Sequence, residues 1–144
     1  MAIENFDANR DINKGQMSEL IMEGETYANF KTFKCDVSSD SEEINIAGKW
    51  GKETVYNGTK ATGSFSLYDT FDGLDEAVLS SFKEKGYWEF NARVRQWNRN
   101  TGAERWAIYE KAKVNKFSPT DIELGKIAEK TYEFTVNPDN IHYE

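Results

Sequence analysis

The chain has 144 residues, the length of a single domain. Its net charge of −7 argues against a general nucleic-acid-binding protein, because such domains are usually basic. Its aromatic content of 14% favours a packed, β-rich domain over disorder, and its 1 cysteine, Cys35, excludes an internal disulfide. A lone cysteine fits a protein that folds and assembles in a reducing cytosol. Residues 1–16 are polar and lack a secretory signal pattern, and no apolar run approaches the ~20 residues that cross a bilayer, so we expect no membrane insertion.

The first elements along the chain are an arm and two strands. Residues 1–16 contain few apolar side chains and no clear period, which indicates an N-terminal arm. Residues 17–23 predict a short strand, and residues 26–37 predict a second strand after the turn "EGE". Alternation along the second strand places three apolar residues on one face: Phe33, Cys35 and Val37.

Residues 38–58 are polar and glycine-containing, and we interpret them as one long loop. Connections of this length are uncommon inside a compact domain and are usually functional. The segment also contains four apolar residues with no predicted core to enter: Ile44, Ile46, Trp50 and Val55. Apolar groups on an exposed loop predict a contact with another molecule.

The next predicted strand, residues 58–68, alternates without a strongly apolar face. One face has the thinly apolar residues Ala61, Gly63, Phe65 and Leu67, and the other has Lys60, Thr62, Ser64, Ser66 and Tyr68. A strand between a core and bulk water usually has larger side chains on both faces. The pattern therefore indicates that the small polar face contacts neither a core nor ordinary bulk water.

A helix is predicted from an N-cap at Asp72 to a stop at Gly86. Asp75 and Glu76 lie in its first turn, where the helix dipole favours acids. Its apolar residues recur at helical spacing: Leu74, Ala77, Val78 and Phe82.

Three strands complete the predicted domain. Residues 87–97 and 103–117 form a hairpin around the turn "NRNTG", and after the loop "SPTDIELGK" residues 130–136 form the last strand. The expected inward faces are Trp88, Phe90, Ala92 and Val94; then Trp106, Ile108, Ala112 and Val114; then Tyr132, Phe134 and Val136. The chain is thus predicted to be one domain, residues 1–144, mainly β, sandwich-like or barrel-like, with one helix packed on it. The predicted core comprises Trp88, Phe90, Val94, Ile108 and Phe134, covered by Leu74, Val78 and Phe82.

Catalytic, cofactor and metal motifs fit poorly. The 1 histidine, His142, is the third residue from the end of the sequence, where we expect it to be solvated. "GKWGKET" has the wrong spacing for a phosphate-binding loop, and "DTFDGLD" lacks the ligands of a calcium loop. We therefore expect no enzyme activity, cofactor or metal.

One region is basic. Residues 87–117 contain seven basic and three acidic side chains, with Trp97 and Tyr109 interleaved. Such a surface favours either a contact between subunits or the clamping of single-stranded nucleic acid by a β-barrel. A small ligand-binding barrel is a third alternative.

Four stretches, in order, carry a resemblance to a known family: "GQMSELIMEGETYANFKTFKCDV", "NGTKATGSFSLY", "FDGLDEAVLSSFKEKG" and "YEFTVNP". They resemble the tail tube proteins of contractile-tailed bacteriophages and phage-tail-like bacteriocins, especially the type of the defective prophage PBSX and its clostridial relatives. The resemblance covers residues 17–136. Residues 1–16 and "WNRNTGAERW" have no match, so the roles of the arm and of the 97–106 turn stay open.

The resemblance implies a β-sandwich protomer that forms hexameric rings, whose strands join into one large continuous barrel and whose rings stack into a tube. It also implies that the segment 38–58 reaches into the neighbouring subunits or into the next ring. The polar face of Lys60, Thr62, Ser64 and Ser66 would then line an aqueous bore. The bore wall should be neutral or net acidic, with Lys60 offset by nearby acids, because phosphate contacts would slow the transit of DNA.

The resemblance also implies the partners. Sheath, baseplate and tail-terminator proteins would bind the tube, and DNA would be only a transient cargo. We expect Asp72, Asp75 and Glu76 to face outward toward the sheath. The protein would assemble in the bacterial cytoplasm and become part of a virion tail or of a released bacteriocin particle, two alternatives that the sequence leaves open.

Overall fold

The computed structural model describes residues 5–15 and 18–144. In this part of the chain eight strands form one antiparallel sheet in the order β2-β1-β5-β6-β7-β4-β3, with β8 paired to β6. The strands are β1 (Ser18–Met22), β2 (Glu25–Thr26), β3 (Phe30–Asn45), β4 (Lys52–Tyr68), β5 (Trp88–Trp97), β6 (Glu104–Phe117), β7 (Glu129–Val136) and β8 (Ile141–Tyr143). The predicted mainly β class is confirmed; residues 1–4 and 16 of the predicted arm, and Met17 of the first predicted strand, lie outside the described residues.

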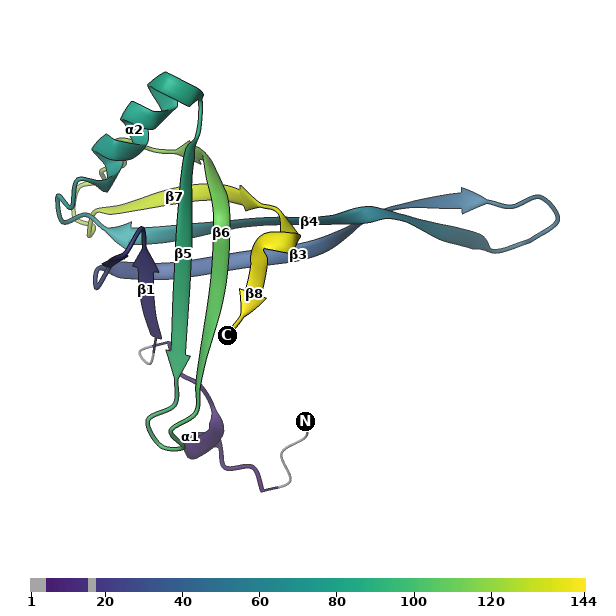
Figure 1. Cartoon of the computed structure of the whole chain (residues 1–144), viewed down its shortest axis with the longest axis horizontal. Helices are drawn as coiled ribbons and strands as arrows, with labels where there is room; N and C mark the ends of the chain where they lie inside the picture. Colours follow the sequence, from purple (N-terminus) through teal and green to yellow (C-terminus); the bar gives the residue numbers. More distant parts are fainter. Residues whose placement is uncertain (1–4, 16–17) are drawn as a thin grey trace.

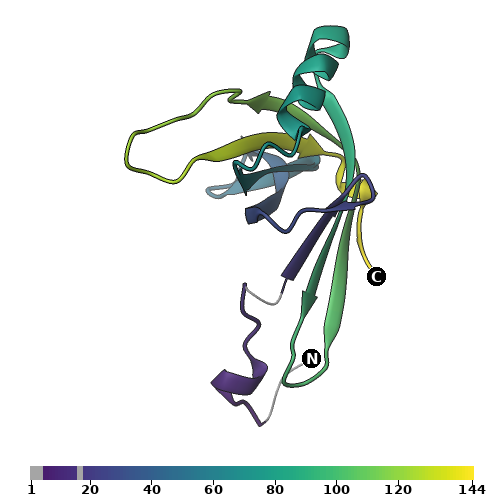
Figure 2. The ribbon, with the colours of Figure 1, turned by 90° about the vertical axis from the view of Figure 1, so that its left-hand side faces the viewer.

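The sheet folds over itself into two layers (Figures 1 and 2). Strands β1, β5 and the first half of β6 cross over β3, β4 and β7, and β6 pairs with both β5 and β7. The helix α2 (Leu74–Lys85) lies at one end of this sandwich. The arrangement encloses one hydrophobic core between the layers, as the predicted sandwich requires.

Aromatic rings from both layers meet in the core. Phe90 of β5 is fully buried, and its ring centroid lies 5.6 Å from that of Phe65 on β4 and 5.5 Å from that of Phe134 on β7. The predicted burial of Phe90 and Phe134 is confirmed, and Trp88 and Val94 are partly buried against the same cluster.

A β-bulge reverses the predicted face of β6. Phe90 pairs with Ala112 but Ala92 pairs with Tyr109, so two residues of β6, 110 and 111, stand opposite one residue of β5. Lys111 takes a positive φ of 55° there, and its N–H donates to the side-chain oxygen of Asn91 at 2.9 Å. The extra residue shifts the alternation by one.

The predicted inward face of β6 is therefore half right. Ala112 and Val114, after the bulge, are buried as predicted. Trp106 and Ile108, before it, pair with Arg95 and Arg93 and share the outer face of the sheet with them, so their predicted inward orientation is wrong.

The helix α2 ends as predicted but begins one residue late. Gly86 takes a left-handed φ of 84°, and its N–H donates to the Phe82 carbonyl at 2.9 Å, which ends the helix. The N-cap is Gly73 rather than Asp72, although an Asp72 carboxylate oxygen accepts a hydrogen bond from the Leu74 N–H at 3.0 Å. Leu74 and Val78 are buried and Phe82 packs on the core, as predicted.

Two short segments outside the predicted strands and helix are held by tertiary hydrogen bonds. The one-turn helix α1 (Ala8–Asp11) lies on the β5–β6 turn, where the buried Asn98 side-chain amide donates to the Arg10 carbonyl at 2.7 Å. A 3₁₀ turn (Pro138–Asn140) leads into β8, which pairs with β6. Thus part of the arm and the 97–106 turn contact each other within the chain. No helix among residues 5–15 and 18–144 is long and apolar enough to cross a membrane.

Candidate functional site

The segment predicted as a loop is a long β-ribbon, so the prediction of a loop at 38–58 is wrong. Strands β3 and β4 pair from Phe30 and Leu67 out to Asn45 and Lys52, and only residues 46–51 connect them. Strand β7 covers β4 from Ala61 to Tyr68. The outer half of the β3–β4 ribbon therefore projects alone from the body of the protein (Figure 1).

The projecting ribbon exposes apolar side chains. Ile44 and Val55 each expose 41% of their surface, Trp50 in the connecting turn is fully exposed, and Ile46 is half-buried. Ile44 pairs with Glu53, and Val55 pairs with Glu42, so the two apolar residues lie on one face of the ribbon. An isolated two-stranded ribbon is only marginally stable in water, so a contact with another molecule would stabilise the outer half, and that contact stays a prediction.

The root of the ribbon explains the thinly apolar strand. Ala61, Phe65 and Leu67 are buried in the core as predicted. A side chain at Gly63 would place its Cβ 2.1 Å from the Lys34 carbonyl oxygen and 2.7 Å from Cζ of Phe134. Gly63 is therefore required where the Phe134 ring and the paired strand approach the backbone of β4.

The other face of β4 belongs to a wider polar wall. Thr62 pairs with Asp36 of β3 and Thr135 of β7, and Ser64 pairs with Glu133 of β7. Lys60 and Thr62 are exposed and Ser64 is half-buried, whereas Ser66 exposes only 8%, and its hydroxyl lies 3.1 Å from that of Thr131. The wall spans three adjacent strands, and Ser66 contributes little exposed surface to it.

Charges on this wall are mixed. Lys34 lies 3.4 Å from Asp36, and Lys116 lies 3.7 Å from Glu133. Lys60 instead lines a shallow depression together with Lys111, Lys113 and one acid, Glu89. The expected offset of Lys60 by nearby acids is thus weak within the described chain.

Two of the three predicted sheath-facing acids are engaged inside the chain. The Lys130 ammonium donates to Asp75, and this hydrogen bond holds the pKa of the Asp75 carboxyl below its ordinary value. Asp72 accepts from the Leu74 N–H and from the Asn29 amide at 3.1 Å. Glu76 is exposed. A sheath-facing role for Asp72, Asp75 and Glu76 stays a prediction, with Glu76 the member best placed for it.

Two arginines of the basic strand β5 are paired with acids of the chain and packed on tryptophan rings. The Arg95 guanidinium donates to Glu104 and lies 4.7 Å from the ring centroid of Trp97. Arg93 donates to Glu144 at 2.8 Å and lies 4.7 Å from the Trp106 ring. Stacked guanidinium groups cover the indole faces that bases would need, which disfavours a single-strand nucleic-acid site here.

A second exposed apolar region lies at the opposite end of the molecule from the ribbon tip. It is formed by the loops 69–73 and 118–128, and the second loop projects from the body (Figure 2). Phe71 is 96% exposed and Leu124 is 97% exposed, with Ile122 and Ile127 also exposed. The sequence patterns did not single out this region, although Ile122, Leu124 and Ile127 in a polar loop are the same signal that marked residues 38–58.

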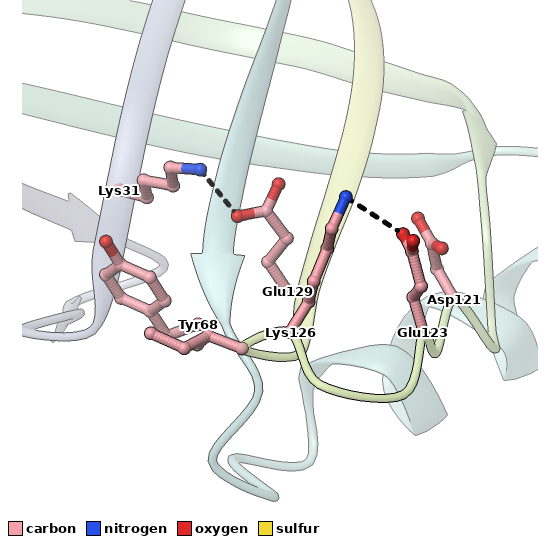
Figure 3. A pocket seen from close by; sticks show the side chains of 7 residues that line it. Lys31, Tyr68, Asp121, Glu123, Lys126 and Glu129 are labelled. Atoms are coloured by element: carbon pink, nitrogen blue, oxygen red, sulfur yellow. Dashed lines mark hydrogen bonds and ion pairs between the residues drawn. The ribbon is translucent and has the colours of Figure 1, made fainter.

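A depression beside the second loop is lined by charged groups (Figure 3). Its walls are Lys31, Tyr68, Asp121, Glu123, Lys126, Ile127 and Glu129, and its volume is about 460 Å³. Lys31 donates to Glu129 at 2.7 Å, and Lys126 lies 3.3 Å from Glu123. The depression therefore combines paired charges with the apolar surfaces of Tyr68 and Ile127.

Reactive groups are few. His142 lies on β8, where it is exposed as expected, 4.0 Å from Glu110. Burial raises the pKa of the half-buried Cys35 thiol. Within the described ranges no cluster of three or more histidine, cysteine or acidic residues is arranged to hold a metal ion. The absence of catalytic, cofactor and metal sites stays a prediction.

Comparisons with known proteins point to one family. A family model described as "Phage tail tube protein" matches residues 4–139. The phage-like element PBSX protein XkdM of Bacillus subtilis (strain 168) is 25% identical over 99 residues, which cover 67% of each chain.

Solved structures share the fold at low identity. A chain of an extracellular contractile injection system, the PVC sheath–tube complex in the extended state, matches with a TM-score of 0.69 and 10% identity, covering 95% of this chain and 94% of that one. A chain of the sixfold-symmetrised anti-feeding prophage baseplate matches with a TM-score of 0.66 and 7% identity, covering 88% and 90%.

Proposed function

The chain belongs to the phage tail tube protein family, a family of structural proteins, and from that premise we propose that it forms hexameric rings that stack into the inner tube of a contractile particle. The sixfold symmetry is supported by the similar chain in a sixfold-symmetrised baseplate. The contractile character is supported by the similar chain in a sheath–tube complex. The protein is a component of the particle and performs no chemistry.

The observation that carries the ring proposal is the projecting β3–β4 ribbon. Its outer half has no strand beside it in the described chain, yet it exposes Ile44, Trp50 and Val55. A ribbon that contacts a different surface on the next copy makes a heterologous contact, which closes into a ring or extends into a filament. Both outcomes occur in a tube of stacked rings.

Sheet edges support the same conclusion. Strand β3 is the last strand of the sheet order, so its 16 residues present an open edge within the described residues. Exposed edges of this length template aggregation unless they are covered. Closing the strands of six protomers into one barrel removes the edges and places one face of the wall toward the bore.

The polar wall is the face we assign to the bore. Lys60, Thr62 and Ser64 present short or flexible polar groups that keep the wall hydrated. Two lysines of the wall are paired, Lys34 with Asp36 and Lys116 with Glu133, whereas Lys60, Lys111 and Lys113 share one acid, Glu89. DNA would pass such a wall without being held, since tight binding requires many unpaired cations at phosphate spacing.

The remaining partners follow from the particle. Sheath subunits would surround the tube, and baseplate and tail-terminator proteins would bind its two ends. The tube would assemble in the bacterial cytoplasm and leave the cell in a virion tail or in a bacteriocin particle.

Removing the ribbon tip tests the proposal. A variant that lacks residues Ser41–Lys52 retains the inner half of the ribbon and should stay folded and soluble, with near-ultraviolet circular dichroism like that of the parent. Negative-stain electron microscopy should show long tubes for the parent and none for the variant. Normal tubes from the variant would mean that the ribbon is not the assembly contact.

A milder variant guards against misfolding of the deletion. Replacing Ile44 and Trp50 with serine removes apolar surface but leaves every ladder hydrogen bond of the ribbon in place. The double variant should also fail to form long tubes, whereas a matched pair of substitutions on the β5–β6 turn, Arg99→Ser and Thr101→Ser, should not change tube formation.

A further inference from the structure

We propose that the loops 69–73 and 118–128 form a socket that receives the ribbon tip, residues 46–52, of a copy in the adjacent ring. The proposal rests on the proposed function, because it names the surface that the ribbon contacts. It assigns a role to an exposed apolar region that the assembly contact of residues 38–58 leaves unexplained.

The two loops of the socket lie side by side. The Asp69 N–H donates to the Ala128 carbonyl at 3.0 Å, and Lys130, which pairs with Asp75 after the first loop, donates to the Pro119 carbonyl in the second at 3.0 Å. Strand pairing of Tyr68 with Glu129 fixes the ends of both loops. The ends of the two loops are therefore held together, and the second loop projects further from the body than the first (Figure 2).

The tip and the socket lie at opposite ends of the long axis of the molecule (Figure 1). A chain cannot bring its own tip to its own socket without dismantling the β3–β4 ribbon. The two surfaces can meet only between copies, and each copy offers one of each. Repetition of that contact along an axis produces an open stack, because a heterologous contact that does not close generates a filament.

The socket exposes apolar side chains, one of them on a backbone with an unfavourable positive φ. Phe71 is 96% exposed and has a φ of 56°, in the left-handed region that bulky residues rarely adopt. Leu124, in the neighbouring loop, is 97% exposed. Strained, exposed apolar residues are typical of binding surfaces, and Trp50 of the tip is the kind of large, flat side chain that anchors an interface.

Charge complements this apolar match. The tip contains Lys49 and Lys52 and no acid, whereas the socket contains four acids and one lysine: Asp69, Asp72, Asp121, Glu123 and Lys126. Opposite potentials on the two surfaces select the tip-to-socket contact over tip-to-tip contact. The depression beside the second loop has room for the Trp50 indole, and the carboxylates of Asp121 and Glu123 at its rim can accept the indole N–H (Figure 3).

Charge reversal in three variants tests the socket. A tip variant has Lys49→Glu with Lys52→Glu, a socket variant has Asp121→Lys with Glu123→Lys, and a third variant combines all four changes. Each of the first two should shorten the mean tube length in electron micrographs at least tenfold at low salt. The combined variant should recover long tubes, because its reversed tip again meets a socket of opposite charge.

A matched control separates this contact from a general charge effect. Lys83→Glu with Lys85→Glu reverses two charges on α2, outside both surfaces, and should leave tube length unchanged. Parental tube length in the tip or socket variant overturns the proposal, and so does a combined variant that is folded but forms no long tubes.

Ring formation distinguishes this proposal from the function on which it rests. Sedimentation of the tip and socket variants should show single rings that do not stack. If the parent forms neither rings nor tubes, the proposed function fails. If the parent forms tubes and the reversals do not shorten them, only the socket fails.

Discussion

Replacing Gly63 with alanine tests the register of the ribbon root, on which the placement of both the polar wall and the tip depends. The added methyl carbon would lie 2.1 Å from the Lys34 carbonyl oxygen, whereas real Cβ atoms essentially never approach other heavy atoms within 3.0 Å. The obstacle is backbone and cannot rotate away, so β3 and β4 must separate locally by roughly 1 Å. Overpacking usually costs about 1–3 kcal/mol, and we expect the upper end of that range here, about 3 kcal/mol.

Urea unfolding of the unassembled protein, followed by tryptophan fluorescence, measures the loss. The control is Gly51→Ala, at a glycine where an added Cβ would meet no other group within 4 Å and where the backbone has no left-handed φ. Both substitutions reduce the entropy of the unfolded chain equally, so their difference reports the clash alone. A free energy of unfolding for Gly63→Ala within about 0.5 kcal/mol of the control would show that the strands do not approach as described.

Three further substitutions probe the body of the protein, each by the free energy of unfolding. Phe90→Ala should cost about 3–5 kcal/mol, because the ring is fully buried between Phe65 and Phe134, and a loss under about 1 kcal/mol would contradict the core. Lys111→Gly should stabilise by about 0.5 kcal/mol, because glycine relieves the positive φ of the bulge, and a clear destabilisation would place the bulge elsewhere. Asp75→Asn should destabilise the protein near neutral pH but not in acid. The folded Asp75 carboxyl has a pKa below its ordinary value of 3.8, so its ion pair contributes stability above pH 3.8. That stability is lost as the pH falls through the folded pKa. Parent and Asp75→Asn should therefore converge at low pH, and a gap that persists there would exclude the Lys130 ion pair as its source.

Elements with one buried face are the ones that alternation predicts correctly. Phe65 and Leu67 on β4 and Phe90 on β5 enter the core as the period of two requires, and Gly86 ends α2 because it tolerates a left-handed φ. In each case burial or a backbone conformation restricts the residue type. Local sequence patterns are therefore sufficient to predict these features.

Local sequence patterns do not predict elements that are solvated on both faces or held only by tertiary contacts. The outer ribbon has no core to face, so no hydrophobic period marks Ser38–Asn45 as a strand. The helix α1 depends on the amide of Asn98, which is distant in sequence. The reversal of Trp106 and Ile108 depends on a single bulged residue, Lys111, whose type gives no sign of a positive φ.

In the candidate site, too, the sequence predicts some features and not others. The polar face at Lys60, Thr62 and Ser64 follows from alternation, and the exposure of Ile44 and Trp50 follows from their polar surroundings. The engagement of Asp75 by Lys130 joins residues 55 positions apart, which no local pattern encodes. The socket needs two loops brought together by the pairing of β4 with β7.

A cryo-electron microscopy reconstruction of the purified protein after assembly tests the central claim most directly. We predict stacked sixfold rings around an open bore, with Lys60, Thr62 and Ser64 on the wall that faces the bore and the β3–β4 ribbon in contact with neighbouring copies. A stable monomer, a particle that forms only with single-stranded nucleic acid, or a tube whose bore is lined by the Arg93 and Trp106 face of β5 and β6 would contradict the account.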